Sequence, residues 1–156
     1  MRIVLLAVGN RMPDWIDEGF ETYRKRLPRQ CELQLTEIPA VRRRSRADAG
    51  VAKVREGERL LKSARAADRV IALDERGSEW TTSQLAGRLQ DWQQTCSTLA
   101  LLIGGPDGLS DDCLAASDER WSLSRLTLPH ALVRVLVAEQ LYRAWTLLQG
   151  HPYHRD

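Results

Sequence analysis

Two uninterrupted apolar runs, each followed by glycine, constrain the fold more than any other feature. Residues 2–9 read RIVLLAVG, and residues 98–103 read TLALLI and lead into Gly104. A strand with one solvent-exposed face alternates apolar and polar residues, whereas a continuous apolar run is typical of a strand buried on both faces. Such strands belong to parallel sheets that helices cover on both sides.

The segments around these two runs supply further strands and the covering helices. Additional strands are expected at residues 31–38 and 69–74 and within residues 121–128. Helical patterns run over residues 14–26, 51–67, 80–94, 110–116 and 129–148, with Ser110 as a possible cap, and residues 41–50 read as a loop. The alternation predicts an α/β fold: a single domain over residues 1–156 with an open, mainly parallel sheet and helices on both faces.

The charge balance limits the class of partner. The chain has 156 residues and a formal net charge of only +2, too little for a protein that coats nucleic acid non-specifically. Residues 1–65 nevertheless carry 15 basic and 9 acidic side chains, and residues 66–156 carry 8 and 12. This asymmetry suggests that the first half faces a polyanion, although solvated arginines on helices explain it equally well.

The cysteines and the first apolar run indicate the compartment. Cys31, Cys96 and Cys113 are odd in number and contain no C-x-x-C pair, which argues against a disulfide framework and a structural zinc site. The first apolar run is too short for a signal-peptide core or a membrane span. We therefore expect a cytoplasmic protein that binds no membrane.

The glycine-rich segment after the second apolar run is a candidate ligand loop. In open α/β sheets ligands bind beyond the carboxyl ends of the strands, where glycine lets a ligand approach the backbone. Residues 104–108 (GGPDG) match neither the phosphate-binding nor the dinucleotide-binding pattern, so nucleotide triphosphatases and standard dinucleotide enzymes are disfavoured. A turn that only reverses the chain remains an equal alternative.

The last helix is apolar on two sides, which favours packing on the sheet with one side and on a second subunit with the other. Burial within one subunit is the alternative. Arg134 falls inside an apolar stripe, so its charge must be paired or functionally needed. Arg143 follows Glu139 by four residues, and an ion pair between them competes with any functional role.

The chain end and one internal loop carry further candidates. His151, Tyr153, His154 and Arg155 could hold a nucleobase by stacking and polar contacts, while disorder is the plain alternative and a metal site has weak support. Phosphate contacts are plausible at Arg42, Arg43, Arg44 and Arg46, as is a solvated loop.

Four segments together resemble one known family. They are residues 7–15 (AVGNRMPDW), 101–110 (LLIGGPDGLS), 121–145 (WSLSRLTLPHALVRVLVAEQLYRAW) and 151–155 (HPYHR). Over its whole length the chain resembles bacterial pseudouridine N3-methyltransferases of large-subunit (23S) ribosomal RNA. These belong to the trefoil-knotted SPOUT superfamily of S-adenosylmethionine-dependent RNA methyltransferases.

The resemblance implies a C-terminal trefoil knot, a homodimer, and S-adenosylmethionine bound in the knot without a metal. It implies cofactor contacts at Leu73, Ile103, Gly104, Gly105, Ser124, Arg125, Leu126, Thr127, Leu128 and Pro129. The substrate it implies is a pseudouridine of ribosomal RNA, methylated on the assembled ribosome.

For catalysis the resemblance leaves four candidates. His154 and His130 are favoured for the N3 proton, beside Tyr153, and Arg143 would stabilise the anion or contact RNA. RNA contacts would come from Arg42, Arg43, Arg44, Arg46 and Arg155, with Lys53 or Arg55. Two rivals remain: a ribosome-binding dimer without activity, and a methyltransferase that acts on transfer RNA.

Overall fold

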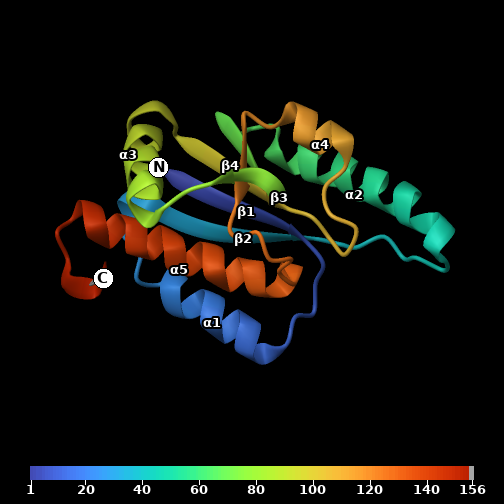
Figure 1. Ribbon diagram of the computed structural model, residues 1–156, viewed down its shortest axis with the longest axis horizontal. Coiled ribbons are helices and arrows are strands. Elements are labelled where there is room, and N and C mark those ends of the chain that lie inside the picture. Colours follow the sequence, from blue (N-terminus) through green and yellow to red (C-terminus); the bar gives the residue numbers. More distant parts are fainter. Residues whose placement is uncertain (155–156) are drawn as a thin grey trace.

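The computed structural model describes residues 1–154, with only the backbone at His154, and centres on a five-stranded sheet (Figure 1). Every neighbouring pair is parallel, and the strand order is β2-β1-β4-β3-β5. The strands are β1 (Arg2–Val8), β2 (Glu32–Ile38), β3 (Arg69–Glu79), β4 (Thr98–Ile103) and β5 (Glu119–Ser122). The expected α/β fold with a parallel sheet is confirmed.

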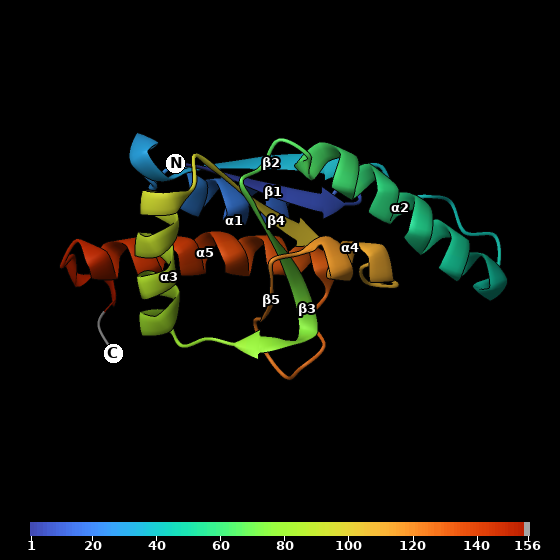
Figure 2. The ribbon, with the colours of Figure 1, turned by 90° about the horizontal axis from the view of Figure 1, so that it is seen from above.

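Helices cover both faces of the sheet, and each face has its own apolar core. On one side lie α1 (Asp14–Arg24), α3 (Thr82–Thr95) and α5 (His130–Leu148); on the other lie α2 (Ala49–Ala64) and α4 (Asp111–Ala116) (Figures 1 and 2). In β1, Leu5 packs towards α1 and α5, whereas Leu6 packs towards α2 and α4. This double burial explains why the central strands are apolar without alternation.

The end of the third strand differs from its expected position. We expect the strand to end at residue 74, but β3 continues to Glu79 after a register shift between Leu73 and Ser78, and Ser78 then pairs with Trp121. Gly77 permits this close approach, because a Cβ there would lie 2.7 Å from the carbonyl carbon of Arg120. The extension follows from contact with β5 and not from a local pattern.

The fifth strand is shorter than its apolar pattern indicates. It covers only Glu119–Ser122, and the remainder of residues 121–128 forms an irregular loop. The Ser122 hydroxyl donates to the Ser124 carbonyl (2.9 Å), and the Ser124 hydroxyl accepts from the Leu126 amide (2.9 Å). These local bonds replace sheet pairing and turn the chain towards α5.

The loop before α2 is also more ordered than expected. A short 3₁₀ turn covers Arg46–Asp48, and Ser45 and Asp48 form a capping box. As a result α2 begins at Ala49, earlier than expected, and extends beyond the sheet (Figure 2).

The three cysteines are free and buried, and burial raises the pKa of the Cys31 thiol to about 12. None of the helices described here has the length and apolar character needed to cross a membrane.

Candidate functional site

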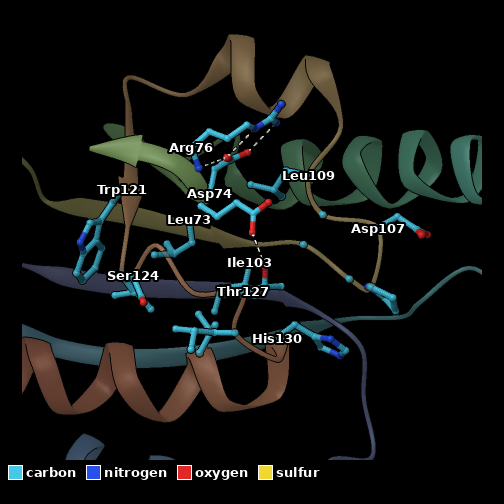
Figure 3. Close-up of a pocket in the computed structure, with 18 of the residues that line it drawn as sticks. Leu73, Asp74, Arg76, Ile103, Asp107, Leu109, Trp121, Ser124, Thr127 and His130 are labelled. Atoms are coloured by element: carbon cyan, nitrogen blue, oxygen red, sulfur yellow. Dashed lines mark hydrogen bonds and ion pairs between the residues drawn. The ribbon is translucent and has the colours of Figure 1, made fainter. Parts of the chain in front are cut away.

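A cavity of about 490 Å³ opens beside the register shift of β3 and the carboxyl ends of β4 and β5 (Figure 3). Its walls are residues 73–76 of β3, the glycine loop after β4, the loop after β5 and the first turn of α5. The structure brings together most of the expected cofactor residues here, with His130: Leu73, Ile103, Gly104, Gly105, Ser124, Leu126, Thr127 and Leu128. Arg125 and Pro129 lie beside the cavity without lining it.

The glycines of the loop are required by the loop's own fold. A Cβ on Gly104 would lie 2.4 Å from the carbonyl carbon of Gly108, which no side chain can tolerate. A Cβ on Gly105 would point into the interior, 3.0 Å from Val8 Cγ1 and 3.2 Å from Glu56 Oε2. The Gly108 amide donates to the Gly105 carbonyl (3.0 Å) and closes the turn. The loop thus presents its backbone to the cavity.

One end of the cavity is apolar and aromatic. Trp121 lies there with Leu73 and Ser124 (Figure 3). Its ring stacks on Trp80, with ring centroids 5.2 Å apart and planes 14° apart, and is buried. A flat apolar ligand group fits this end. Its apolar surface would be removed from water there, and few polar groups of the wall would lose their contact with water.

Three carboxylates also line the cavity, and none of them is among the site residues expected from the sequence. Asp74 pairs with Arg76 (3.1 Å), which lowers the pKa of the Asp74 carboxyl, and Glu75 accepts a hydrogen bond from Thr127 Oγ1 (3.0 Å; Figure 3). Asp107 contributes a third carboxylate from the glycine loop. The signal was available, since Asp74 and Glu75 directly follow the apolar part of a predicted strand.

His130 is the first residue of α5 and lines the cavity at the end that Asp107 also occupies (Figure 3). Loss of solvent, and next the positive charge of Arg134, lower the pKa of His130 from its ordinary value. The imidazole is therefore neutral near pH 7 and can accept a proton.

Arg134 lies one turn further along α5 and is completely buried. Its guanidinium donates to Glu37 Oε2 (2.8 Å) and to the carbonyl of Gly9 (2.7 Å), where Gly9 has a φ of 104°. The charge of Arg134, which lies within an apolar stripe of the helix, is thus paired. The contacts join the start of α5 to the ends of β1 and β2.

Arg143 and Tyr153 do not reach this cavity within one chain. Arg143 lies 13 residues beyond His130, about 20 Å along the helix, and forms the i,i+4 ion pair with Glu139 (2.6 Å). The Tyr153 hydroxyl donates to the same carboxylate (3.2 Å). Burial raises the pKa of Tyr153, so the phenol stays protonated. Arg155 and the side chain of His154 lie outside the described residues.

The segment with four arginines at residues 42–46, called the basic loop below, lies beside the cavity. Arg42, Arg44 and Arg46 are exposed, whereas Arg43 is half-buried and contacts Glu56 and Asp107. Lys53 of α2 lines the cavity. Among the side chains that the structure describes, no cluster of three or more His, Cys, Asp or Glu residues could hold a metal ion.

Solved structures with a similar fold include proteins described as methylases or methyltransferases. A probable methylase family protein from Haemophilus influenzae matches with a TM-score of 0.61 and 16% identity, covering 99% of this chain and 70% of that one. A methyltransferase from Legionella pneumophila, solved with the cofactor SAM bound, matches with a TM-score of 0.51 and 12% identity over 92% of this chain and 66% of that one. At such identities the likeness establishes the fold alone.

Sequence relatives match over the full chain. Proteins named ribosomal RNA large subunit methyltransferase H are 55% identical in Hahella chejuensis, covering 100% of both chains, and 57% identical in Alkalilimnicola ehrlichii, covering 99% of both. The family model described as "Predicted SPOUT methyltransferase" matches residues 1–154. With the parallel sheet and its cavity, these matches establish that the chain belongs to the SPOUT methyltransferase family.

Proposed function

We propose that this protein transfers a methyl group from S-adenosylmethionine to N3 of a pseudouridine in large-subunit ribosomal RNA. The observation that carries the proposal is full-length identity above half to relatives named for large-subunit ribosomal RNA methylation. The cavity supports it, because it combines an apolar end, a backbone-lined loop and a neutral imidazole.

The residues of the cavity fit the cofactor. The apolar end suits an adenine ring, and the carboxylates of Asp74 and Glu75 suit the ribose hydroxyls and the positive charges of the cofactor. S-adenosylmethionine supplies an electrophilic methyl group on a sulfonium. No metal is required for this transfer.

The chain's own contribution to the chemistry is the removal of a proton and the alignment of the base. N3 of pseudouridine carries an imide proton and becomes a good nucleophile only as that proton leaves. His130 is the proton-handling candidate whose described side chain lines the cavity, and its lowered pKa keeps the imidazole neutral and so able to accept a proton. His154 remains the second candidate. Cavity walls that hold N3, the methyl group and the sulfur in line supply much of the remaining rate enhancement.

A homodimer accounts for the placement of Arg143 and Tyr153. Trp15 on α1 is 61% exposed, and Leu132, Val135 and Leu136 on α5 are only half-buried. A second copy on this face would cover them. In that dimer the end of α5 and the tail of one subunit complete the cavity of its partner.

The RNA-facing surface of the proposed enzyme is the basic loop with the tail. Arg42, Arg44 and Arg46 are exposed and would contact phosphates, as would Arg155. Such contacts position RNA without reading its sequence, so specificity would come from the shape of the assembled ribosome. We further propose that residues 1–156 form one domain with a C-terminal trefoil knot, and that the enzyme acts in the cytoplasm, where ribosomes reside.

Methylation of purified particles tests the proposed reaction. Intact ribosomes incubated with protein and S-adenosylmethionine should gain one methyl group on a pseudouridine-containing fragment of large-subunit RNA, as mapped by mass spectrometry. Ribosomes assembled with unmodified RNA are the matched control and should gain none. A methyl group that appears only on transfer RNA would overturn the substrate, and cofactor binding without any transfer would favour the non-catalytic rival.

A further inference from the structure

We propose that Arg43 is a positioning residue that holds the glycine loop in its cofactor-binding shape through Asp107, and is not a phosphate contact. The inference rests on the proposed function only in taking the cavity as the cofactor site. It concerns the one arginine of the basic loop that turns inwards.

All three nitrogens of the Arg43 guanidinium already have partners. Nη1 and Nη2 each lie 3.0 Å from an oxygen of Glu56, and Nη1 also donates to the Val41 carbonyl (2.9 Å). Nε donates to Asp107 of the glycine loop. The Arg43 side chain is only 20% exposed. A guanidinium has five N–H donors in a fixed fork, so little of it remains to bind a phosphate.

Glu56 holds the Arg43 guanidinium in place with its buried carboxylate. Its side chain is 2% exposed, and it accepts a hydrogen bond from the Val41 amide (3.0 Å). The carboxylate lies directly beneath Gly105, as the position of a Cβ there shows. A buried carboxylate needs a countercharge, and Arg43 supplies it. Arg43 therefore links the basic loop, α2 and the glycine loop.

The neighbouring arginines have no comparable contacts. Arg42 and Arg44 are exposed, and neither forms an ion pair with another described side chain. The loop thus alternates outward and inward arginines. The outward ones suit a polyanion, and the inward one suits a structural contact.

Asp107 carries the effect of Arg43 to the cofactor site. It lines the cavity near His130, on the loop whose turn Gly105 and Gly108 close (Figure 3). Without Arg43 the glycine loop samples more conformations, and the cofactor must order the loop when it binds. The free-energy cost of this ordering weakens cofactor affinity, whereas the rate at saturating cofactor stays largely unchanged.

Matched variants of the basic loop test the inference. Calorimetry on the free full-length protein should show that Arg43→Gln and Asp107→Asn each weaken S-adenosylmethionine binding about tenfold, whereas Arg44→Gln leaves it unchanged. The double variant Arg43→Gln with Asp107→Asn should bind about as well as either single variant, because the two side chains act as one unit. In turnover, Arg43→Gln should raise KM for the cofactor while kcat stays near its original value.

Ribosome binding gives the opposite pattern. Arg44→Gln should lower the salt slope of ribosome binding by about one, and Arg43→Gln should leave the slope unchanged. Arg43→Lys keeps a countercharge for Glu56 but loses the fork. It should therefore melt near the original temperature while faster hydrogen exchange at residues 104–108 reports the loosened loop.

Three outcomes would overturn the inference: unchanged cofactor affinity in Arg43→Gln, a salt slope lowered as in Arg44→Gln, or additive losses in the double variant. A wild-type protein that binds no S-adenosylmethionine would instead contradict the proposed function. Hydrogen exchange at residues 104–108 then still decides whether Arg43 holds the loop.

Discussion

His130 lies where the dry interior of the protein meets the cavity, and its neighbours define its charge. The buried Arg134 one turn away repels a second positive charge, and a nearby carboxylate, Glu56, opposes this effect more weakly. Loss of solvent is the largest influence, so the pKa of His130 falls below the ordinary 6.5. A neutral imidazole at this position can accept the N3 proton of a bound base.

The pH dependence of methyl transfer should report this imidazole. The single-turnover rate should fall as the pH drops through a pKa below 6.5, because protonated His130 cannot act as a base. His130→Gln should be much slower and should lack this acid limb. His151→Gln, which removes an exposed histidine of the tail, is the control and should keep the limb. An acid limb that persists in His130→Gln would transfer the role to His154.

The same lowered pKa affects folding. Below pH 6.5 the unfolded chain binds a proton at His130 that the folded protein resists, so the free energy of unfolding decreases as the pH falls through that window. His130→Gln should remove this part of the acid sensitivity, as urea unfolding at several pH values can show.

At the scale of elements, Arg134 fastens α5 to two strands. We expect Arg134→Met to lower the free energy of unfolding by about 3 kcal/mol, because the carbonyls of Val8 and Gly9 lose a buried donor and Glu37 loses its partner. Urea unfolding at one fixed protein concentration measures this change. Arg143→Met on the same helix breaks a partly exposed pair and should cost less than about 1 kcal/mol. Equal losses would contradict the fastening role of Arg134.

The elements differ in how far the sequence predicts them. The central strands follow from their own composition, because double burial removes polar residues from the run. The end of β3 and the length of β5 could not be predicted, since both depend on the pairing of Ser78 with Trp121. The partners of the inward-pointing arginines could not be predicted from the sequence either, because they are far away along the chain. Arg134 binds Glu37 across 97 positions, and Arg43 binds Asp107 across 64 positions.

The candidate site shows the same division. The glycine loop and the residues before α5 are recognisable as segments, and the structure assembles them around one cavity. The carboxylates of Asp74, Glu75 and Asp107 could not be singled out from the sequence, because acidic residues near the ends of apolar runs are common. Only the fold shows that they line one cavity.

For the whole molecule, α5 separates two parts of the proposed active site. His130 lies at its beginning, in the cavity, and Tyr153 packs beside Glu139 and Tyr142 near its other end. One chain does not bring both to a single base, whereas the proposed dimer would do so if its two chains run in opposite directions.

Mixed dimers should therefore recover activity that neither component has. A protein without residues 153–156 should bind the cofactor but transfer no methyl group, and Gly104→Val should fail to bind the cofactor. An equal mixture, exchanged into mixed dimers, should regain roughly a quarter of the original rate, since half of the dimers would carry one complete site. Mixed dimers without activity would show that the tail serves its own subunit, and light scattering that finds only monomers would exclude the dimer.

The pairing of β1 with β4 has a consequence for how the chain is made. Arg2 meets Thr98 across 96 positions, so the centre of the sheet pairs its first strand with its fourth. Contacts this remote in sequence slow folding, because a long loop must close before they form. During synthesis β1 can pair only with β2 until β4 has left the ribosome. The cavity forms later still, because one of its walls comes from α5. A nascent chain therefore gains its sheet late and its active site last, on the kind of particle that it is proposed to modify.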